Sequence, residues 1–236
     1  MPDLVDDLRS RIAEAADPDR APQMQAYMKS ELPFRGVSSV PLRAITREVV
    51  AAHPLPDRAS WQAAVLELWD GGAYREERYA ALAVAGHRLY RAYRDPGSLP
   101  LYRHLVVTGA WWDLVDTIAA QHVGEVLGRF PADVAPVVRS WAVDEDLWLR
   151  RTAVLCQLKR KADTDLELLR FTLEHNLDDS LHGREFFIRK ALGWALREHA
   201  RTGPDWGRAF VAEHETRLSG LTRREALKHL AAHPSR

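Results

Sequence analysis

Residues 111–116, with the sequence WWDLVD, place two adjacent indoles directly before two carboxylates that are three residues apart. Turn residues precede the stretch and apolar residues follow it at helical spacing, so we expect it to begin a helix. On that helix Trp112 and Asp116 stand at i and i+4 and share a face, whereas Asp113 points about 100° away. An indole beside a carboxylate suits the binding of a cation, or the stabilisation of a positive charge that develops during a reaction.

Helical periodicity runs along the whole chain and strand patterns are nearly absent, so we expect an all-α fold. Proline and glycine separate the periodic segments, and no linker is long enough to divide the chain. We therefore expect a single domain over residues 1–236. Helices are expected over 2–16, 21–31, 40–52, 59–70, 75–93, 98–108, 111–129, 133–143, 146–161, 163–175, 184–201, 204–215 and 221–232.

Four of these helices begin with similar aromatic segments, in which Tyr79, Trp112, Trp148 and Phe187 follow one another at steps of 33, 36 and 39 residues. A period of this size with two helices per unit is typical of an α-solenoid, a superhelix of degenerate HEAT-like repeats. The period drifts and the units share no consensus, so a helical bundle without repeats is the alternative interpretation.

In a solenoid the second helices of successive units lie side by side and line one surface. Counted from the aligned aromatic residue, Trp112 is at position 0 and Asp116 at +4, Arg151 is at +3 on the next helix, and Trp194 is at +7 on the helix after that. These positions form one helical stripe. The register therefore predicts that the four side chains line one surface.

The chain has 33 basic and 33 acidic residues, and this neutral balance argues against a protein that binds nucleic acid over its whole surface. Basic residues nevertheless gather in three places, where the alternative interpretation is a solvated helix face. The clusters are Arg150, Arg151, Lys159, Arg160 and Lys161; Arg184, Arg189, Lys190, Arg197 and Arg201; and Arg223, Arg224 and Lys228.

Other features limit the class of protein. The single cysteine, Cys156, excludes an intramolecular disulfide and is expected to be buried. The N-terminal segment does not resemble a signal peptide, and no apolar run has the roughly 20 residues that span a bilayer. His229 and His233 have a spacing that could bind metal but lack a third ligand, so we expect no metal site and no cofactor.

The sequence resembles the AlkD-type alkylpurine DNA glycosylases, the DNA alkylation repair family built from HEAT-like repeats. The resemblance covers nearly the whole chain in order. It is carried by segments 27–29 (YMK), 34–37 (FRGV) with Pro41 and Arg43, 111–116 (WWDLVD), 148–151 (WLRR), 185–194 (EFFIRKALGW) and 221–226 (LTRREA). The chain departs from the family in a longer loop over Asn176–Gly183 and in its neutral net charge.

This resemblance implies hydrolysis of the N-glycosidic bond of N3- and N7-alkylated purines, of the 3-methyladenine and 7-methylguanine type, in duplex DNA. It places the catalytic aspartate at Asp116, the two site tryptophans at Trp112 and Trp194, and a supporting arginine at Arg151. It also matches Tyr27 to a DNA-facing tyrosine. We take a monomer as the default and expect no cofactor. The resemblance, together with a reduced Cys156, implies the bacterial cytoplasm, with the protein on the nucleoid when it acts.

A site with one catalytic carboxylate and no general acid suits this reaction. Alkylation at N3 or N7 makes the purine cationic, so it leaves without the general acid that glycoside hydrolysis normally needs. One carboxylate can then stabilise the oxocarbenium-like sugar and position a water. We expect Arg151 to bind a DNA phosphate, because a cation beside the sugar would oppose the reaction. Arg189 and Lys190, from the second basic cluster, are expected to bind DNA as well.

The alternative in another class is a catalytically inactive HEAT-like module that binds damaged or branched DNA, or a protein partner. Asp116 distinguishes the two, because a pure binder of a polyanion has no use for a carboxylate on its binding face.

Overall fold

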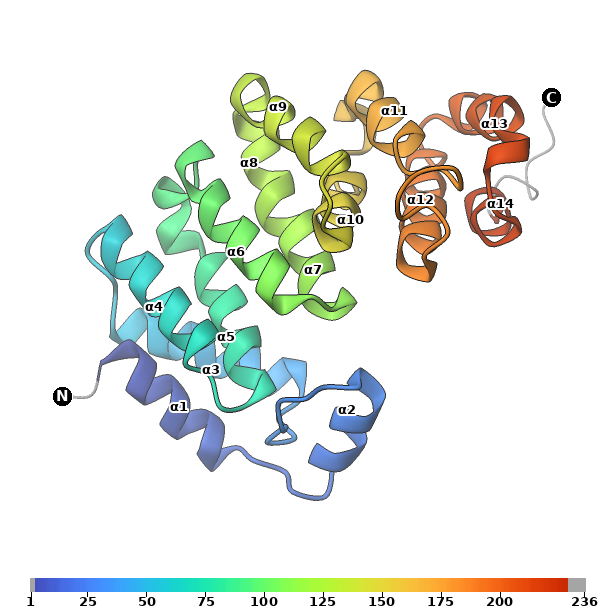
Figure 1. Ribbon diagram of the computed structural model, residues 1–236. Helices are drawn as coiled ribbons and strands as arrows, with labels where there is room; N and C mark the ends of the chain where they lie inside the picture. Colours follow the sequence, from blue (N-terminus) through green and yellow to red (C-terminus); the bar gives the residue numbers. More distant parts are fainter. Residues whose placement is uncertain (1–2, 229–236) are drawn as a thin grey trace. The chain divides into compact units, whose positions relative to one another are not determined.

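The computed structural model describes residues 3–228, and within these residues every regular element is a helix. This confirms the all-α prediction (Figure 1). The chain divides into two compact units, Met1–Arg94 and Asp95–Arg236, each with its own core. None of the helices among the described residues is long and apolar enough to cross a bilayer.

The first unit contains α1 (Leu4–Glu14), α2 (Ala21–Met28), α3 (Ser39–Ala52), α4 (Arg58–Asp70), α5 (Arg75–Ala85) and a 3₁₀ segment over Arg88–Tyr93. Helix α1 packs against α3, α4 and α5, and α4 packs against α5. Trp61 and Trp69 are fully buried in this core. Helix α2, by contrast, has no buried residue.

A buried carboxylate in the first unit holds the segment between α2 and α3. Glu76, at the start of α5, accepts hydrogen bonds from the backbone N–H groups of Arg35, Gly36 and Val37 at 2.9 to 3.1 Å. Gly36 has a φ of 84°, a conformation that disfavours any residue with a Cβ atom. The FRGV segment is thus a turn shaped around one acidic side chain.

The second unit repeats a pair of helices. Its helices are α6 (Leu99–Gly109), α7 (Trp112–Thr117), a π-helical segment (Ile118–Val123), α8 (Gly124–Arg129), α9 (Pro131–Ala142), α10 (Leu147–Leu155), α11 (Leu166–Glu174), α12 (Phe186–His199), α13 (Pro204–Glu213) and α14 (Gly220–Leu227). Short 3₁₀ segments occur at Pro96–Ser98, Lys161–Asp163 and Glu215–Arg217. Helix α10 packs against α7 and α12, and α12 packs against α14. The second helices of successive pairs are therefore neighbours, as HEAT-like repeats require.

Two glycines allow these second helices to approach closely. A Cβ atom on Gly193 of α12 would lie 2.6 Å from the Cβ atom of Glu225 on α14. A Cβ atom on Gly124 of α8 would lie 2.4 Å from the carbonyl oxygen of Cys156, which follows α10. Both distances are shorter than van der Waals contact, so larger residues would push the helices apart.

Most expected helices are present, and the main differences are two early ends and one internal segment. The segment expected over 75–93 stops at Ala85 and continues as the 3₁₀ segment, and the helix expected over 146–161 ends at Leu155. The helix over 111–129 contains the π-helical segment, which we did not expect. The end of the helix expected over 221–232 lies outside the described residues.

Candidate active site

Helix α7 positions the WWDLVD segment. Ala110 ends α6 in a left-handed conformation with a φ of 38°, and the extended Trp111 then starts the new helix. Leu114 and Val115 are fully buried and fix the rotation of α7. Trp112 and Asp116 consequently share the opposite, half-buried side, as their spacing predicted.

Asp116 forms a bidentate ion pair with Arg151 of α10. Arg151 Nε donates to Asp116 Oδ1 at 2.7 Å, and Arg151 Nη2 donates to Asp116 Oδ2 at 2.8 Å. The Asp116 side chain is 15% exposed and the Arg151 side chain is 5% exposed, so the pair is largely shielded from water. Two parallel hydrogen bonds fix both the position and the plane of the carboxylate.

Arg151 also joins α7 to a third helix. Its Nη1 donates to the carbonyl oxygen of Phe187, in the first turn of α12, and its guanidinium lies 5.9 Å from the Phe187 ring centroid. The buried guanidinium is thus held by Asp116 on one side and by α12 on the other. We expected Arg151 to bind a DNA phosphate, and here its buried guanidinium is instead occupied by partners within the protein.

The pKa of Asp116 is raised above its usual value, mainly because burial disfavours the charged carboxylate. The hydrogen bonds and the charge of Arg151 lower this pKa, whereas the neighbouring Asp113 raises it. Because both oxygens accept a hydrogen bond from Arg151, the arrangement fits the ionised carboxylate. Arg151 therefore opposes the effect of burial on Asp116.

An aromatic cluster lies beside this ion pair. Trp111, Trp148 and Phe187 come from the starts of α7, α10 and α12, and their ring centroids are 4.9 to 6.2 Å apart. Phe186 meets Phe187 edge to face at 5.5 Å and is 56% exposed. The cluster fixes the first turn of α12, which holds Arg151 through the Phe187 carbonyl.

The two other expected catalytic side chains lie on α7 and α12. Trp112 is the first residue of α7, one turn before Asp116, and is half-buried. Trp194 lies two turns after Phe187 on α12 and packs, half-buried, against the core of the second unit. The helices that carry Trp112 and Trp194 therefore also carry the two partners of Arg151, which are Asp116 on α7 and the Phe187 carbonyl on α12.

The basic residues expected to bind DNA form ion pairs within the protein. Arg189 Nη2 donates to Asp178 Oδ2 at 3.1 Å, and Lys190 Nζ donates to Glu225 Oε1 at 3.0 Å. Both cationic side chains remain partly exposed. Tyr27, on α2 in the first unit, is 73% exposed.

The first basic cluster is not a solvated face throughout, because Arg150 and Arg151 are both buried. Arg150 donates to the carbonyl oxygens of Val143, Asp144 and His175, which follow the ends of α9 and α11. The third cluster, in contrast, borders an open groove of about 720 Å³ between α13 and α14, whose lining includes Arg208, Arg223, Arg224 and Lys228.

A family model described as "DNA alkylation repair enzyme" matches residues 8–230 of the chain. The chain belongs to the DNA alkylation repair enzyme family. Among solved structures, a predicted DNA alkylation repair enzyme from Enterococcus faecalis is similar, with 27% sequence identity and a TM-score of 0.81. The alignment covers 92% of this chain and 98% of that one. No curated protein matches the chain.

Membership of the DNA alkylation repair family confirms the resemblance that the motifs indicated, and the similar solved structure confirms the fold class. The repeat register placed Asp116 and Arg151 on one stripe of adjacent helices, but it did not predict that the two side chains form an ion pair. The recurrence of an aromatic residue at the start of three helices was the one available signal for the cluster around Phe187.

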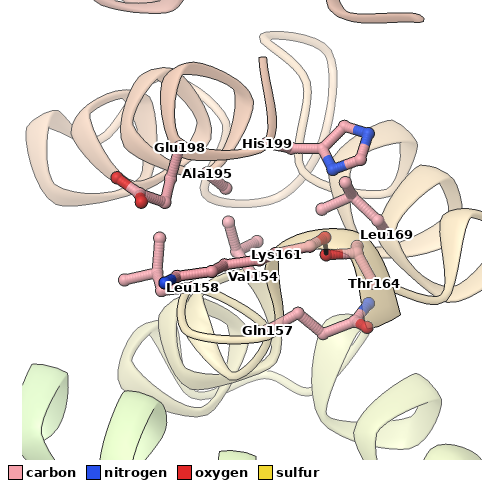
Figure 2. Close-up of a pocket in the computed structure, with 9 residues that line it drawn as sticks. All are labelled: Val154, Gln157, Leu158, Lys161, Thr164, Leu169, Ala195, Glu198 and His199. Carbon is pink, nitrogen blue, oxygen red and sulfur yellow. Dashed lines mark hydrogen bonds between the residues drawn. The ribbon is translucent and has the colours of Figure 1, made fainter. Parts of the chain in front are cut away.

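Two further features of this family member bear on ligands. A cavity of about 10 Å³ lies among residues of α10, α11 and α12, including Val154, Leu169 and His199 (Figure 2). It has room for about one water molecule and is too small for a nucleobase. Cys156 is buried, as expected, and burial raises the pKa of its thiol to about 12, which excludes a thiolate nucleophile at neutral pH.

Metal ligation was expected nowhere in the chain. His229 and His233, the pair weighed for that role, lie outside the described residues. Within residues 3–228 a different group, Glu174, Glu213 and His214, brings three potential ligand atoms together.

Proposed function

We propose that this protein is a monofunctional DNA glycosylase that hydrolyses the N-glycosidic bond of cationic N3- and N7-alkylated purines in duplex DNA. The observation that carries the proposal is the Asp116 carboxylate, shielded from water and held in one orientation by Arg151, in a member of the DNA alkylation repair family. No cofactor takes part in the proposed reaction.

The chemistry needs one acidic group. A purine alkylated at N3 or N7 carries a positive charge and leaves as a neutral base, so no proton donor is required. As the bond breaks, positive charge grows on the deoxyribose, and the fixed carboxylate of Asp116 stabilises that charge without reorganising. A lone pair that Arg151 does not use accepts a hydrogen bond from the water that attacks the sugar.

The indoles assist the same step. The faces of Trp112 and Trp194 each favour a nearby cation by about 0.5 to 2 kcal/mol. This is small beside the at least about 8 kcal/mol that separates enzymatic from uncatalysed rates. Asp116 therefore supplies most of the stabilisation in this proposal, and the two indoles shape the sugar site.

Arg151 acts in this proposal as a positioning residue rather than as a phosphate ligand. A guanidinium near the sugar opposes the growing positive charge, so we place the deoxyribose on the side of the carboxylate away from Arg151. In return, Arg151 keeps Asp116 ionised where burial alone favours its neutral form. Its contact with the Phe187 carbonyl keeps the pair aligned.

Tyr27, Arg189 and Lys190 are proposed to contact the DNA backbone. For Arg189 and Lys190, a phosphate would replace an internal carboxylate partner, which is a favourable exchange for a partly exposed cation. The substrate is genomic DNA, so we place the active protein, a monomer, in the bacterial cytoplasm at the nucleoid. The reduced, buried Cys156 suits that compartment.

Incubation with duplex DNA that contains one N7-methylguanine, followed by alkaline cleavage of abasic sites, tests the proposal. Asp116→Asn should lose excision by about 100-fold or more and still bind DNA. Asp113→Asn is the matched control, because it removes a carboxylate from the same helix on another face and should retain excision. DNA binding by the folded protein without base release would instead favour the inactive binding module.

A further inference from the structure

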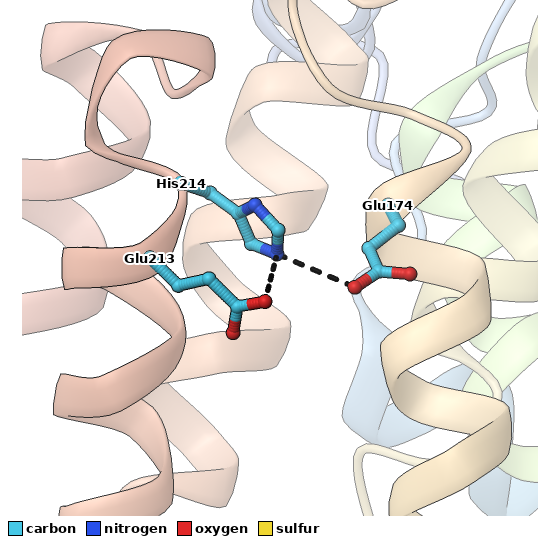
Figure 3. Close-up of side chains that lie close together, drawn as sticks. All are labelled: Glu174, Glu213 and His214. Carbon is cyan, nitrogen blue, oxygen red and sulfur yellow. Dashed lines mark ion pairs between the residues drawn. The ribbon is translucent and has the colours of Figure 1, made fainter.

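Three polar side chains converge where α11 and α13 end in the second unit. Glu174 is the last residue of α11, Glu213 is the last residue of α13, and His214 follows it. His214 Nε2 lies 3.4 Å from Glu174 Oε1 and 4.0 Å from Glu213 Oε1, and the ligand atoms of all three lie within 4.8 Å of one another (Figure 3). The group joins two helices that are 30 or more residues apart in sequence.

His214 is aimed into this group and lacks a hydrogen bond there. Its side chain is only 9% exposed, and Nε2 is buried without a hydrogen-bond partner. Its ring meets Phe210 edge to face at 4.4 Å, which fixes the direction of Nε2. The two carboxylates form ion pairs with this ring only in its protonated form, so a neutral ring leaves a buried nitrogen without a hydrogen bond and in need of a partner.

Arg170 currently supplies the positive charge for the two carboxylates. Its Nη1 donates to Glu174 Oε1 at 3.0 Å and to Glu213 Oε2 at 3.0 Å. An arginine has no acceptor, so it cannot satisfy a histidine nitrogen that offers a lone pair. The Arg170 side chain is 36% exposed and can move into solvent. Arg170 therefore stands where a metal ion would replace it.

We propose that Glu174, Glu213 and His214 bind a divalent transition-metal ion of the Zn²⁺ type. One imidazole nitrogen and two carboxylate oxygens are ligands that Zn²⁺ accepts, with an open fourth position for water. Metal–ligand bonds of about 2.0 to 2.2 Å place tetrahedral ligands about 3.3 to 3.6 Å apart. The His214–Glu174 distance already has this value, whereas the half-exposed Glu213 side chain has to move closer, because its oxygen lies 4.0 Å from His214 Nε2.

The bound ion would link α11 to α13 and stabilise their junction. It would displace the guanidinium of Arg170, so the ion and Arg170 compete for the same carboxylates. Removal of Arg170 should therefore strengthen metal binding. A group that is only an ion-pair network, without a metal site, would not show this effect.

The test uses the full chain after treatment with EDTA, titrated with Co²⁺ and then with Zn²⁺. We expect one Co²⁺ per chain with the visible absorption of a four-coordinate site, displaced by Zn²⁺, and a higher Tm with Zn²⁺. All variants are built with His229→Ala and His233→Ala, so that those two histidines cannot supply the signal. Binding that disappears in this double variant alone overturns the proposal.

Two substitutions then identify the ligands. His214→Ala should weaken Zn²⁺ binding by about 10-fold or more and abolish the rise in Tm, whereas His175→Ala, at an exposed histidine after α11, should change neither. Arg170→Met should tighten binding by about 10-fold, because a competing cation is gone. Arg208→Met, which removes an ion pair elsewhere on α13, is its control. Weaker or equal binding in Arg170→Met, or unchanged binding in His214→Ala, refutes the site.

Discussion

Replacing Arg151 with methionine removes both hydrogen bonds to the Asp116 carboxylate and keeps most of the buried side-chain volume. Burial and Asp113 then act on Asp116 without opposition, and both raise its pKa. Loss of one partner from a buried ion pair costs about 3 to 5 kcal/mol. Neutralisation of Asp116 relieves part of that cost, so its pKa rises further in the variant.

The sign of the effect on activity follows from the ionised carboxylate that the reaction needs. Activity is lost as the pH falls through the pKa of Asp116, and a higher pKa moves this loss to higher pH. Arg151→Met should therefore shift the acid limb of the pH–rate profile towards neutral pH and recover part of its activity in alkaline buffer. Arg151→Lys, which keeps a charge but not the bidentate geometry, should shift the limb less.

The assay is single-turnover excision of N7-methylguanine from a duplex, from about pH 5 to about pH 9, with the fold of each variant checked by circular dichroism. DNA affinity is measured in parallel at several salt concentrations. A phosphate ligand would give a different result: an unmoved acid limb and a salt-dependence slope that falls by about 0.9. That combination would refute the positioning role of Arg151.

Three further predictions concern packing and DNA binding. Gly193→Ala should lower the free energy of unfolding by about 1 to 3 kcal/mol in urea denaturation, because the new methyl group collides with Glu225; unchanged stability would show that the two helices separate easily. Glu76→Gln should cost about 1 to 3 kcal/mol, since an amide replaces the carboxylate that accepts the backbone hydrogen bonds of 35–37, and equal stability would contradict that role. Lys190→Ala should weaken DNA binding and lower the salt slope by about 0.9, and an unchanged slope would remove Lys190 from the DNA surface.

Sequence periodicity predicted nearly all of the helices, because helix formation and the burial of one apolar face depend on residues three and four positions apart. Its errors lie at helix ends and irregularities that the apolar pattern does not mark. Gly86 ends α5 although apolar residues continue beyond it, and the carbonyl of Cys156 meets Gly124 where the helix expected over 146–161 stops. The hydrophobic pattern did not predict the π-helical segment over Ile118–Val123.

The candidate active site likewise combines features that local spacing predicts with contacts that depend on tertiary packing. The i, i+4 spacing put Trp112 and Asp116 on one side of α7, and the ordered motifs pointed to the DNA alkylation repair family, to which the chain belongs. The sequence also placed Arg151 on the same stripe as Asp116, and we expected it to bind a DNA phosphate there. The packing of α10 between α7 and α12 decides otherwise, by burying that guanidinium against Asp116 and the Phe187 carbonyl.

The group formed by Glu174, Glu213 and His214 has no local pattern, because its members meet only when α11 packs beside α13. Which side chains share one face of a helix follows from covalent geometry and helix pitch, so the sequence determines it directly. A contact between residues 35 to 40 positions apart depends on how all the intervening helices pack, and for that reason only the tertiary structure decided the partners of Asp116 and of His214.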